Sequence, residues 1–184
     1  MENIQEKYKR LRSSIKQGDT ILFHGTGIIA KIIQEGDNDA YFNHIGIVVE
    51  IAGVLYIIDS NAPGVHPERL SVRIAKYAAG DGDFVIKRSQ KTVKQITTAL
   101  YNVQQTLEQQ GTVSYDFING AKSLSNRYFK TQFKIKPKAN AMICSMFVYP
   151  YQLELDMIYP RSFEKTLFFP QDSIRFEKNT INII

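Results

Sequence analysis

The strongest constraint on the fold is a pair of β-branched segments separated by a very short turn. Residues 45–50 and 54–58 are rich in isoleucine and valine, which favour extended strands, and Ala52-Gly53 lies between them. A connection this short joins strands that run antiparallel. The sequence therefore predicts a β-hairpin whose open end carries His44 on one strand and Asp59 on the other.

Helical and extended segments surround this hairpin. Apolar spacing and breaker residues predict helices at 2–16, 28–34, 92–109 and 141–155, and strands at 20–23, 83–88 and 174–177. Pro150 is expected to kink or split the last helix. The pattern indicates an α+β fold, with a small antiparallel sheet or half-barrel packed against helices. A chain of 184 residues suits a single domain over residues 1–184.

The chain is basic, with a net charge of +5 and a sequence pI near 9.2. Lysines concentrate in the segment Lys130–Lys138, which suits an anionic polymer as a partner. A solvated surface segment is the favoured interpretation, because no nucleic-acid-binding motif accompanies the charge.

Targeting signals are not evident in the sequence. Residues 1–16 are too charged for a signal peptide, and no apolar run approaches the roughly 20 residues that span a bilayer. One cysteine leaves no intrachain disulfide. These features predict a cytoplasmic protein without a transmembrane segment; a phage-encoded or virion-associated protein is the alternative.

Cys144 is the candidate nucleophile. It lies near the start of the predicted helix 141–155, with Asn140 as the expected N-cap, and the positive end of a helix stabilises a thiolate. Taken alone, a cysteine among apolar residues is more often a small buried hydrophobe. A catalytic reading therefore also requires a base and a group that orients the base.

His44 and Asp59 are the candidates for those two roles. Imidazole titrates near neutrality and can act as base and then as acid. If the hairpin turn is centred at residues 52–53, position 44 should lie beside position 59 or 60, where a carboxylate would orient the imidazole. The alternatives are a strand-end histidine without a role and a turn-capping aspartate. Glu50 and Ser60 remain substitutes for Asp59 if the register differs.

Two further residues are expected near the substrate, namely Tyr115 and His24. For His24, a strand-end histidine facing solvent is the favoured interpretation. No metal or other cofactor is predicted, because the three histidines form no His-Glu-x-x-His motif and the cysteine has no pair.

Several short segments, in this order, resemble the NlpC/p60 superfamily of papain-like hydrolases in its circularly permuted, YiiX/YebB-like branch. They are Gly18-Asp19 with the apolar residues 20–23, His44-Ile45-Gly46-Ile47, Asp59-Ser60, Ser114-Tyr115-Asp116-Phe117, Cys144-Ser145 and Tyr159-Pro160. In the permuted branch the histidine strand precedes the cysteine helix, as it does here. The matching segments cover most of the chain.

The resemblance implies a cysteine peptidase or amidase that works through a Cys144–His44–Asp59 triad and an acyl-enzyme. Peptides or peptidoglycan stem peptides are the first substrate class, and acyl transfer or lipid deacylation is the alternative. A third alternative is a binding or structural module without turnover. Met146 after Cys-Ser, Pro150 in the helix, and Asp59 in place of a second imidazole depart from the family pattern, and the departures leave the substrate class open.

Overall fold

A computed structural model of the chain describes residues 2–27, 30–31, 33–34, 40–61, 64–110, 114–115, 141–142, 144–159 and 169–184. The strands are β1 (Thr20–His24), β2 (His44–Ile51), β3 (Val54–Asn61), β4 (Gly64–Arg69), β5 (Asp83–Ser89), β6 (Ser114–Tyr115), β7 (Ala141–Met142) and β8 (Thr180–Ile183). The helices are α1 (Ile4–Leu11), α3 (Leu70–Ala78), α4 (Val93–Gln110), α6 (Cys144–Glu154) and α7 (Asp172–Arg175), with a 3₁₀ turn at Arg12–Ser14.

The strands form one sheet in the order β7-β6-β4-β3-β2-β1-β5-β8. Every neighbouring pair is antiparallel except β6 and β7, which are parallel. The predicted hairpin is present as β2 and β3, and Ile51 pairs with Val54 across a turn in which Ala52 and Gly53 both have positive φ. The α+β class, with an antiparallel sheet packed against helices, is confirmed.

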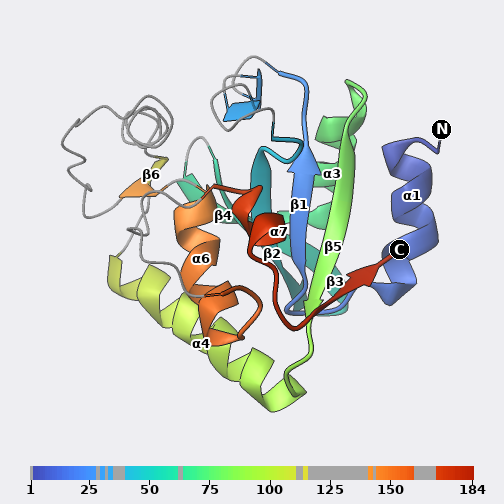
Figure 1. Cartoon of the computed structure of the whole chain (residues 1–184). Helices are drawn as coiled ribbons and strands as arrows, with labels where there is room; N and C mark the ends of the chain where they lie inside the picture. The colour runs from blue at the N-terminus through green and yellow to red at the C-terminus, as the bar shows by residue number, and fades with distance from the viewer. Residues whose placement is uncertain are drawn as a thin grey trace.

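Helices cover the sheet on both sides (Figure 1). Helices α1 and α3 pack on one face, and α4 and α6 pack on the other. Alternate residues of the central strands serve the two faces, because side chains of a strand point alternately up and down. Ile21 and Phe23 of β1 face α1 and α3, whereas Leu22 faces α6.

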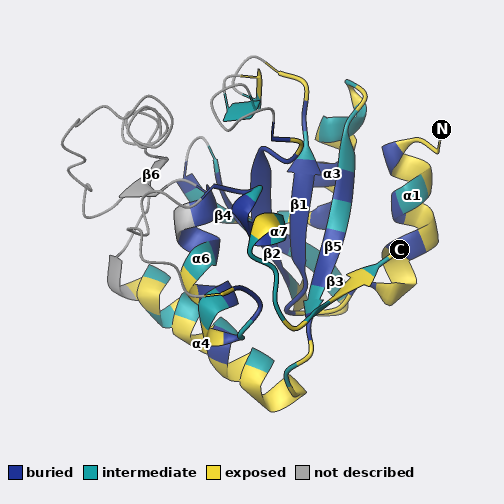
Figure 2. Cartoon of the chain, in the orientation of Figure 1, coloured by how far each residue is buried: buried dark blue, intermediate teal, exposed yellow. Residues whose placement is uncertain are grey.

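The sheet forms the centre of the core. Its middle strands are almost entirely buried, whereas α4 exposes one side along its length (Figure 2). The largest fully buried side chain is Tyr151 of α6, whose hydroxyl donates to the carbonyl of Gly18 at 2.6 Å. This bond ties α6 to the segment before β1. Among the described helices, none has both the length and the apolar character that crossing a bilayer requires.

The Gly18-Asp19 pair has a structural explanation. Gly18 has a φ of +89°, and a Cβ there would lie 2.2 Å from Ile96, so only glycine fits. The buried carboxylate of Asp19 accepts two hydrogen bonds from Arg88 of β5, both at 2.7 Å. Asp19 thus joins the start of β1 to β5.

The structure and the sequence prediction disagree at three elements. Strand β4 and helix α3 were not predicted, because Pro67 and the charged residues around it mask the short apolar pattern. The predicted strand 174–177 is wrong: residues 172–175 form α7, since the Asp172 carboxylate accepts the N–H of Phe169 and folds the chain into a turn.

Helix α6 was expected to be kinked or split at Pro150; it is not split, and it runs through that residue to Glu154. A proline inside a helix costs about 3 kcal/mol. Burial of the neighbouring large side chains Phe147, Val148 and Tyr151 offsets this, at about 1.5–3 kcal/mol each. The helix also begins three residues later than predicted, because Ala141–Met142 form β7.

Candidate active site

The register of the hairpin places His44 and Asp59 on the same face of the sheet. Asp59 pairs with Gly46, two residues after His44. The sequence predicted position 44 beside a position near 59 or 60; Asp59 is in register with position 46, so it lies beside His44 on the diagonal rather than directly across. Residues two apart on a strand share a face, so His44 and Asp59 are diagonal neighbours, a distance that long side chains bridge.

The two side chains are hydrogen-bonded. Nε2 of His44 donates to Oδ2 of Asp59 at 2.8 Å, and the Asp59 side chain is fully buried. Glu50, a substitute candidate, lies towards the other end of β2 and is exposed. Asp59 is therefore the carboxylate that contacts this imidazole.

Gly46 makes this diagonal contact possible. A Cβ at position 46 would lie 2.6 Å from the side chain of Ile57 and 3.0 Å from Cβ of Asp59. The absence of a side chain at position 46 thus leaves room for the Asp59 carboxylate to reach His44. This glycine is part of the His-Ile-Gly-Ile segment that the sequence presented, and it acts here through space rather than through φ.

The second carboxylate oxygen of Asp59 is also hydrogen-bonded. Its Oδ1 accepts hydrogen bonds from Nη2 of Arg73 and from Nδ2 of Asn61, each at 2.8 Å. The carboxylate therefore has three donors, from β2, from β3 itself and from α3. A buried carboxylate requires such compensation.

Cys144 is the first residue of α6, and its side chain is 4 % exposed. It reaches the end of the sheet from the α6 layer, and its interaction with the His44 ring helps to raise the pKa of that imidazole. Because Nε2 is engaged by Asp59, the other ring nitrogen, Nδ1, is the one available to the thiol. The first turn of a helix has backbone N–H groups without intrahelical partners and a positive end of the dipole, and both favour an anion.

The electrostatics of His44 favour the imidazolium form. Burial alone would lower the pKa of His44, but the negative charges of Cys144 and Asp59 and the hydrogen bonds to both outweigh burial and raise the pKa to about 10. The raised pKa means that the His44 ring stays protonated at neutral pH.

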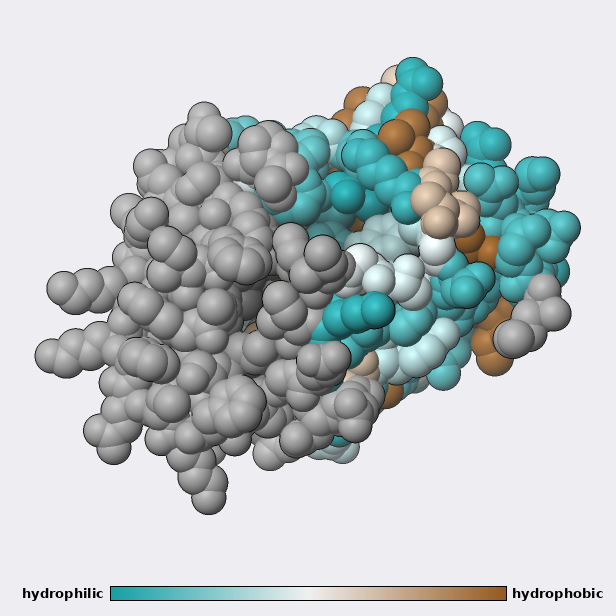
Figure 3. Space-filling model, turned by 90° about the horizontal axis from the view of Figure 1, so that it is seen from above, coloured by the Kyte–Doolittle hydropathy of each residue, from teal (hydrophilic) through white to brown (hydrophobic). Residues whose placement is uncertain are grey.

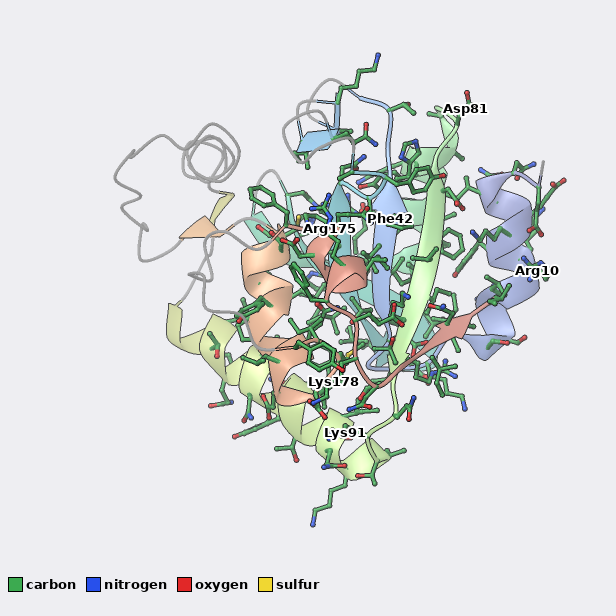
Figure 4. All side chains as sticks on the ribbon, viewed as in Figure 1. Arg10, Phe42, Asp81, Lys91, Arg175 and Lys178 are labelled. Atoms are coloured by element: carbon green, nitrogen blue, oxygen red, sulfur yellow. The ribbon has the colours of Figure 1, made fainter. Side chains whose placement is uncertain are left out.

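Aromatic rings and the preceding segment hold His44 in place. The His44 ring centroid lies 6.1 Å from that of Phe23 and 6.3 Å from that of Tyr77. The N–H of Phe42, two residues before His44, donates to the Gln171 side chain at 2.9 Å, and Figure 4 shows Phe42 beside α7. The start of β2 is therefore held by contacts on both faces of the sheet.

A cavity of about 640 Å³ opens beside His44. Its described lining comprises residues from the segment after β1, the open end of the hairpin and the end of α3: Gly25, Thr26, Gly27, Ala30, Ile33, Asn43, His44, Ser60, Asn61, Lys76, Tyr77, Ala79 and Gly80. It lies at the upper end of the sheet in Figure 1, the end that Asp81 marks in Figure 4. Seen from above, the described surface there is mainly hydrophilic, with small hydrophobic groups (Figure 3). The size suits a small-molecule or peptide group.

Other predicted site residues lie apart or outside the described residues. His24 ends β1 with its ring stacked on Tyr41, at a centroid distance of 4.2 Å, and it is not part of the described lining of the cavity. The side chain of Tyr115, the residue Asn140 and the segment Lys130–Lys138 lie outside what the structure describes.

Among the described side chains, no three histidine, cysteine or acidic groups converge in a way that could hold a metal ion. Cys144, His44 and Asp59 instead form a line in which the imidazole lies between the other two.

Comparison with known proteins bears on the fold. The chain is similar to the crystal structure of metalloprotein YiiX (DUF1105) from Escherichia coli O157:H7, with a TM-score of 0.62 over 92 % of this chain and 96 % of YiiX. The chain has a YiiX-like fold. Sequence identity to YiiX is 16 %, so the likeness concerns the fold alone. No protein-family model and no curated protein sequence matches the chain.

Sequence reasoning missed two residues of the site. Arg73 lies on the helix that was not predicted, so nothing in the sequence connected it to Asp59. Asn61 lies just after the predicted strand 54–58, but its bond to Asp59 depends on the side-chain conformation. The spacing of two residues between Asp59 and Asn61, on one face of a strand, was the available signal.

Proposed function

We propose that this protein is a papain-like cysteine hydrolase of the circularly permuted NlpC/p60 type, with Cys144 as nucleophile, His44 as base and Asp59 as the orienting group. The observation that carries the proposal is the set of contacts that links Cys144, at the start of α6, to His44 and Asp59. The single cysteine of the chain interacts with an imidazole whose Nε2 donates to a buried carboxylate. The likeness to YiiX supports the fold and adds nothing on activity.

The reaction begins with a thiolate at Cys144 and an imidazolium at His44. The thiolate attacks an amide or ester carbonyl, and backbone N–H groups of the first turn of α6 stabilise the oxyanion. The imidazolium donates its proton to the leaving group as the carbon–nitrogen or carbon–oxygen bond breaks, which leaves an acyl group on sulfur. His44 then takes a proton from water as the hydroxide attacks the thioester. Collapse of the intermediate breaks the carbon–sulfur bond, releases the carboxylic acid and restores the thiolate–imidazolium pair.

The substrate group enters the cavity beside His44. Its described lining combines the apolar side chains Ala30 and Ile33 with Thr26, Asn61 and Lys76. An amide or peptide substrate suits this mixture, because it presents both apolar side chains and hydrogen-bonding groups. Acyl transfer or lipid deacylation at the same site, and a module without turnover, are the alternatives that the experiment separates.

The experiment is to trap the acyl-enzyme with an activated ester and locate the added mass by peptide mass spectrometry. Wild-type protein should carry the acyl group on Cys144, and Cys144→Ala should carry none. Ser145→Ala is the matched control, because Ser145 is the adjacent buried side chain and its hydroxyl has no partner among the described groups. Acylation that survives Cys144→Ala, or none in the wild type, would refute the proposal.

Substrate class is then determined by supplying two sets of compounds to the same preparation. Release of amines from peptides and peptidoglycan stem-peptide fragments supports the amidase proposal. Release or transfer of fatty acyl groups from phospholipid vesicles, without amide cleavage, supports the lipid alternative.

A further inference from the structure

Arg73 is the buried cation behind the candidate site. It projects from α3 with 8 % of its side chain exposed, and its Nη2 donates to Oδ1 of Asp59 at 2.8 Å. Oδ2 of the same carboxylate accepts from His44. Asp59 therefore lies between two nitrogen donors, one on each oxygen.

Arg73 is itself held in position by a second carboxylate. Its Nε lies 3.1 Å from Oε2 of Glu68, on β4, and the other oxygen of Glu68 pairs with the ammonium of Lys76. The charges alternate from Lys76 at the cavity through Glu68 and Arg73 to Asp59 and His44. This chain keeps the guanidinium directed at Asp59.

Charge balance explains why an arginine is needed there. When the proton of the thiol resides on His44, the thiolate and the imidazolium cancel each other and leave Asp59 uncompensated. A fully buried carboxylate without a cation is strongly disfavoured, and such a group takes up a proton instead. The arginine guanidinium stays charged at every relevant pH, so it balances Asp59 whichever of Cys144 and His44 carries the proton.

Other groups that face Asp59 do not supply this charge. His66 lies opposite Asp59 on β4, but its Nδ1 bonds to the carbonyl of Gly64. Asn61 is a neutral donor. Among the described residues that contact Asp59, Arg73 is therefore the permanent cation.

We propose that Arg73 is a positioning residue that keeps Asp59 ionised and directed at His44, so that the imidazole retains its proton for the reaction. The effect of Arg73 on catalysis rests on the proposed function. The effect of Arg73 on the pKa of His44 is independent of it, because the Arg73–Asp59 ion pair exists whether or not the protein turns over a substrate. The two can therefore be tested separately.

The test follows the imidazole of His44 by ¹⁵N-histidine NMR as a function of pH. In the wild type His44 should titrate near pH 10, and in Arg73→Gln its pKa should fall by about one to three units, because a protonated Asp59 no longer favours the imidazolium. Arg73→Lys, which retains the charge, should recover most of the difference. Arg69→Gln is the matched control, since Arg69 is an exposed arginine just before the same helix. An Arg73→Gln protein in which His44 titrates at or above the wild-type pH would overturn the proposal.

A double variant keeps the test decisive if Arg73→Gln does not fold. Asp59→Asn combined with Arg73→Gln removes the charges of both partners. Neither position is then left with a buried charge that lacks its counterion. If Arg73 acts through Asp59, adding Arg73→Gln to Asp59→Asn should leave the His44 pKa unchanged or raise it, since only repulsion is lost. A further fall of the pKa in that background would contradict the mechanism. Failure of acyl-enzyme trapping, with these shifts intact, would refute the hydrolase and leave the role of Arg73 standing.

Discussion

Replacing His44 by glutamine should slow alkylation of Cys144 at acidic pH. Glutamine fills a similar volume and can still donate to Asp59, but it cannot hold the thiol proton. Because the chain has one cysteine, iodoacetamide labelling reports on this thiol alone. Cys144 is buried in the wild type. Because glutamine fills a similar volume, limited access should slow both rates alike and cancel from their ratio.

The size of the effect follows from the ionisation of the pair. An ordinary thiol, with a pKa of about 8.5, is only about 0.3 % thiolate at pH 6. The proposed thiolate–imidazolium pair would make Cys144 fully thiolate at that pH, about 300 times more abundant than in an ordinary thiol. A thiolate stabilised by a neighbouring cation is about 30 times less nucleophilic. The net expectation is an advantage of about tenfold for the wild type at pH 6.

The assay measures pseudo-first-order labelling rates from pH 5.5 to 9.5 by intact mass. Wild-type rates should change little across this range, whereas the rates for His44→Gln should rise about tenfold per pH unit up to about pH 8.5. Circular dichroism and thermal melting establish that both proteins are folded. If the two pH profiles coincide, His44 does not carry the thiol proton and the reasoning fails.

Three further predictions concern stability. Gly46→Ala should destabilise the protein by about 1–3 kcal/mol in urea unfolding, because its Cβ would overlap the side chains of β3. Gly27→Ala should be neutral, because a Cβ there would have no atom within 4 Å. Equal effects of the two substitutions would contradict the steric argument. The raised pKa of His44 means that its pairing stabilises the fold fully below about pH 6.5 and loses this contribution as the pH rises through about 10. The difference in unfolding free energy between wild type and His44→Gln should thus shrink from pH 6 to 10.5, and a constant difference would refute it. Asp19→Asn should cost about 3 kcal/mol by weakening the pair with Arg88, and should leave Cys144 alkylation unchanged; loss of labelling in a folded variant would show a role beyond stability.

Much of the architecture was predictable because it depends on local pattern. The hairpin β2–β3, the strands β1 and β5 and the long helix α4 each have a periodicity or a turn that a short window of sequence reveals. Strand β4 and helix α3 lacked such a signal. Their neighbours in the sheet and the core stabilise them, and no local preference indicates that.

The candidate site was likewise predictable from the sequence only in part. By itself, the sequence determined which residue types were available: one thiol near a helix start, one imidazole at a strand start, and a carboxylate at the end of the paired strand. The tertiary structure decided that Asp59 pairs with Gly46 and reaches His44 diagonally, and that a buried Arg73 from an unpredicted helix holds the other oxygen of the carboxylate. Contacts between distant segments depend on strand register and on the packing of whole elements, and both are set by the burial of the entire core rather than by neighbouring residues.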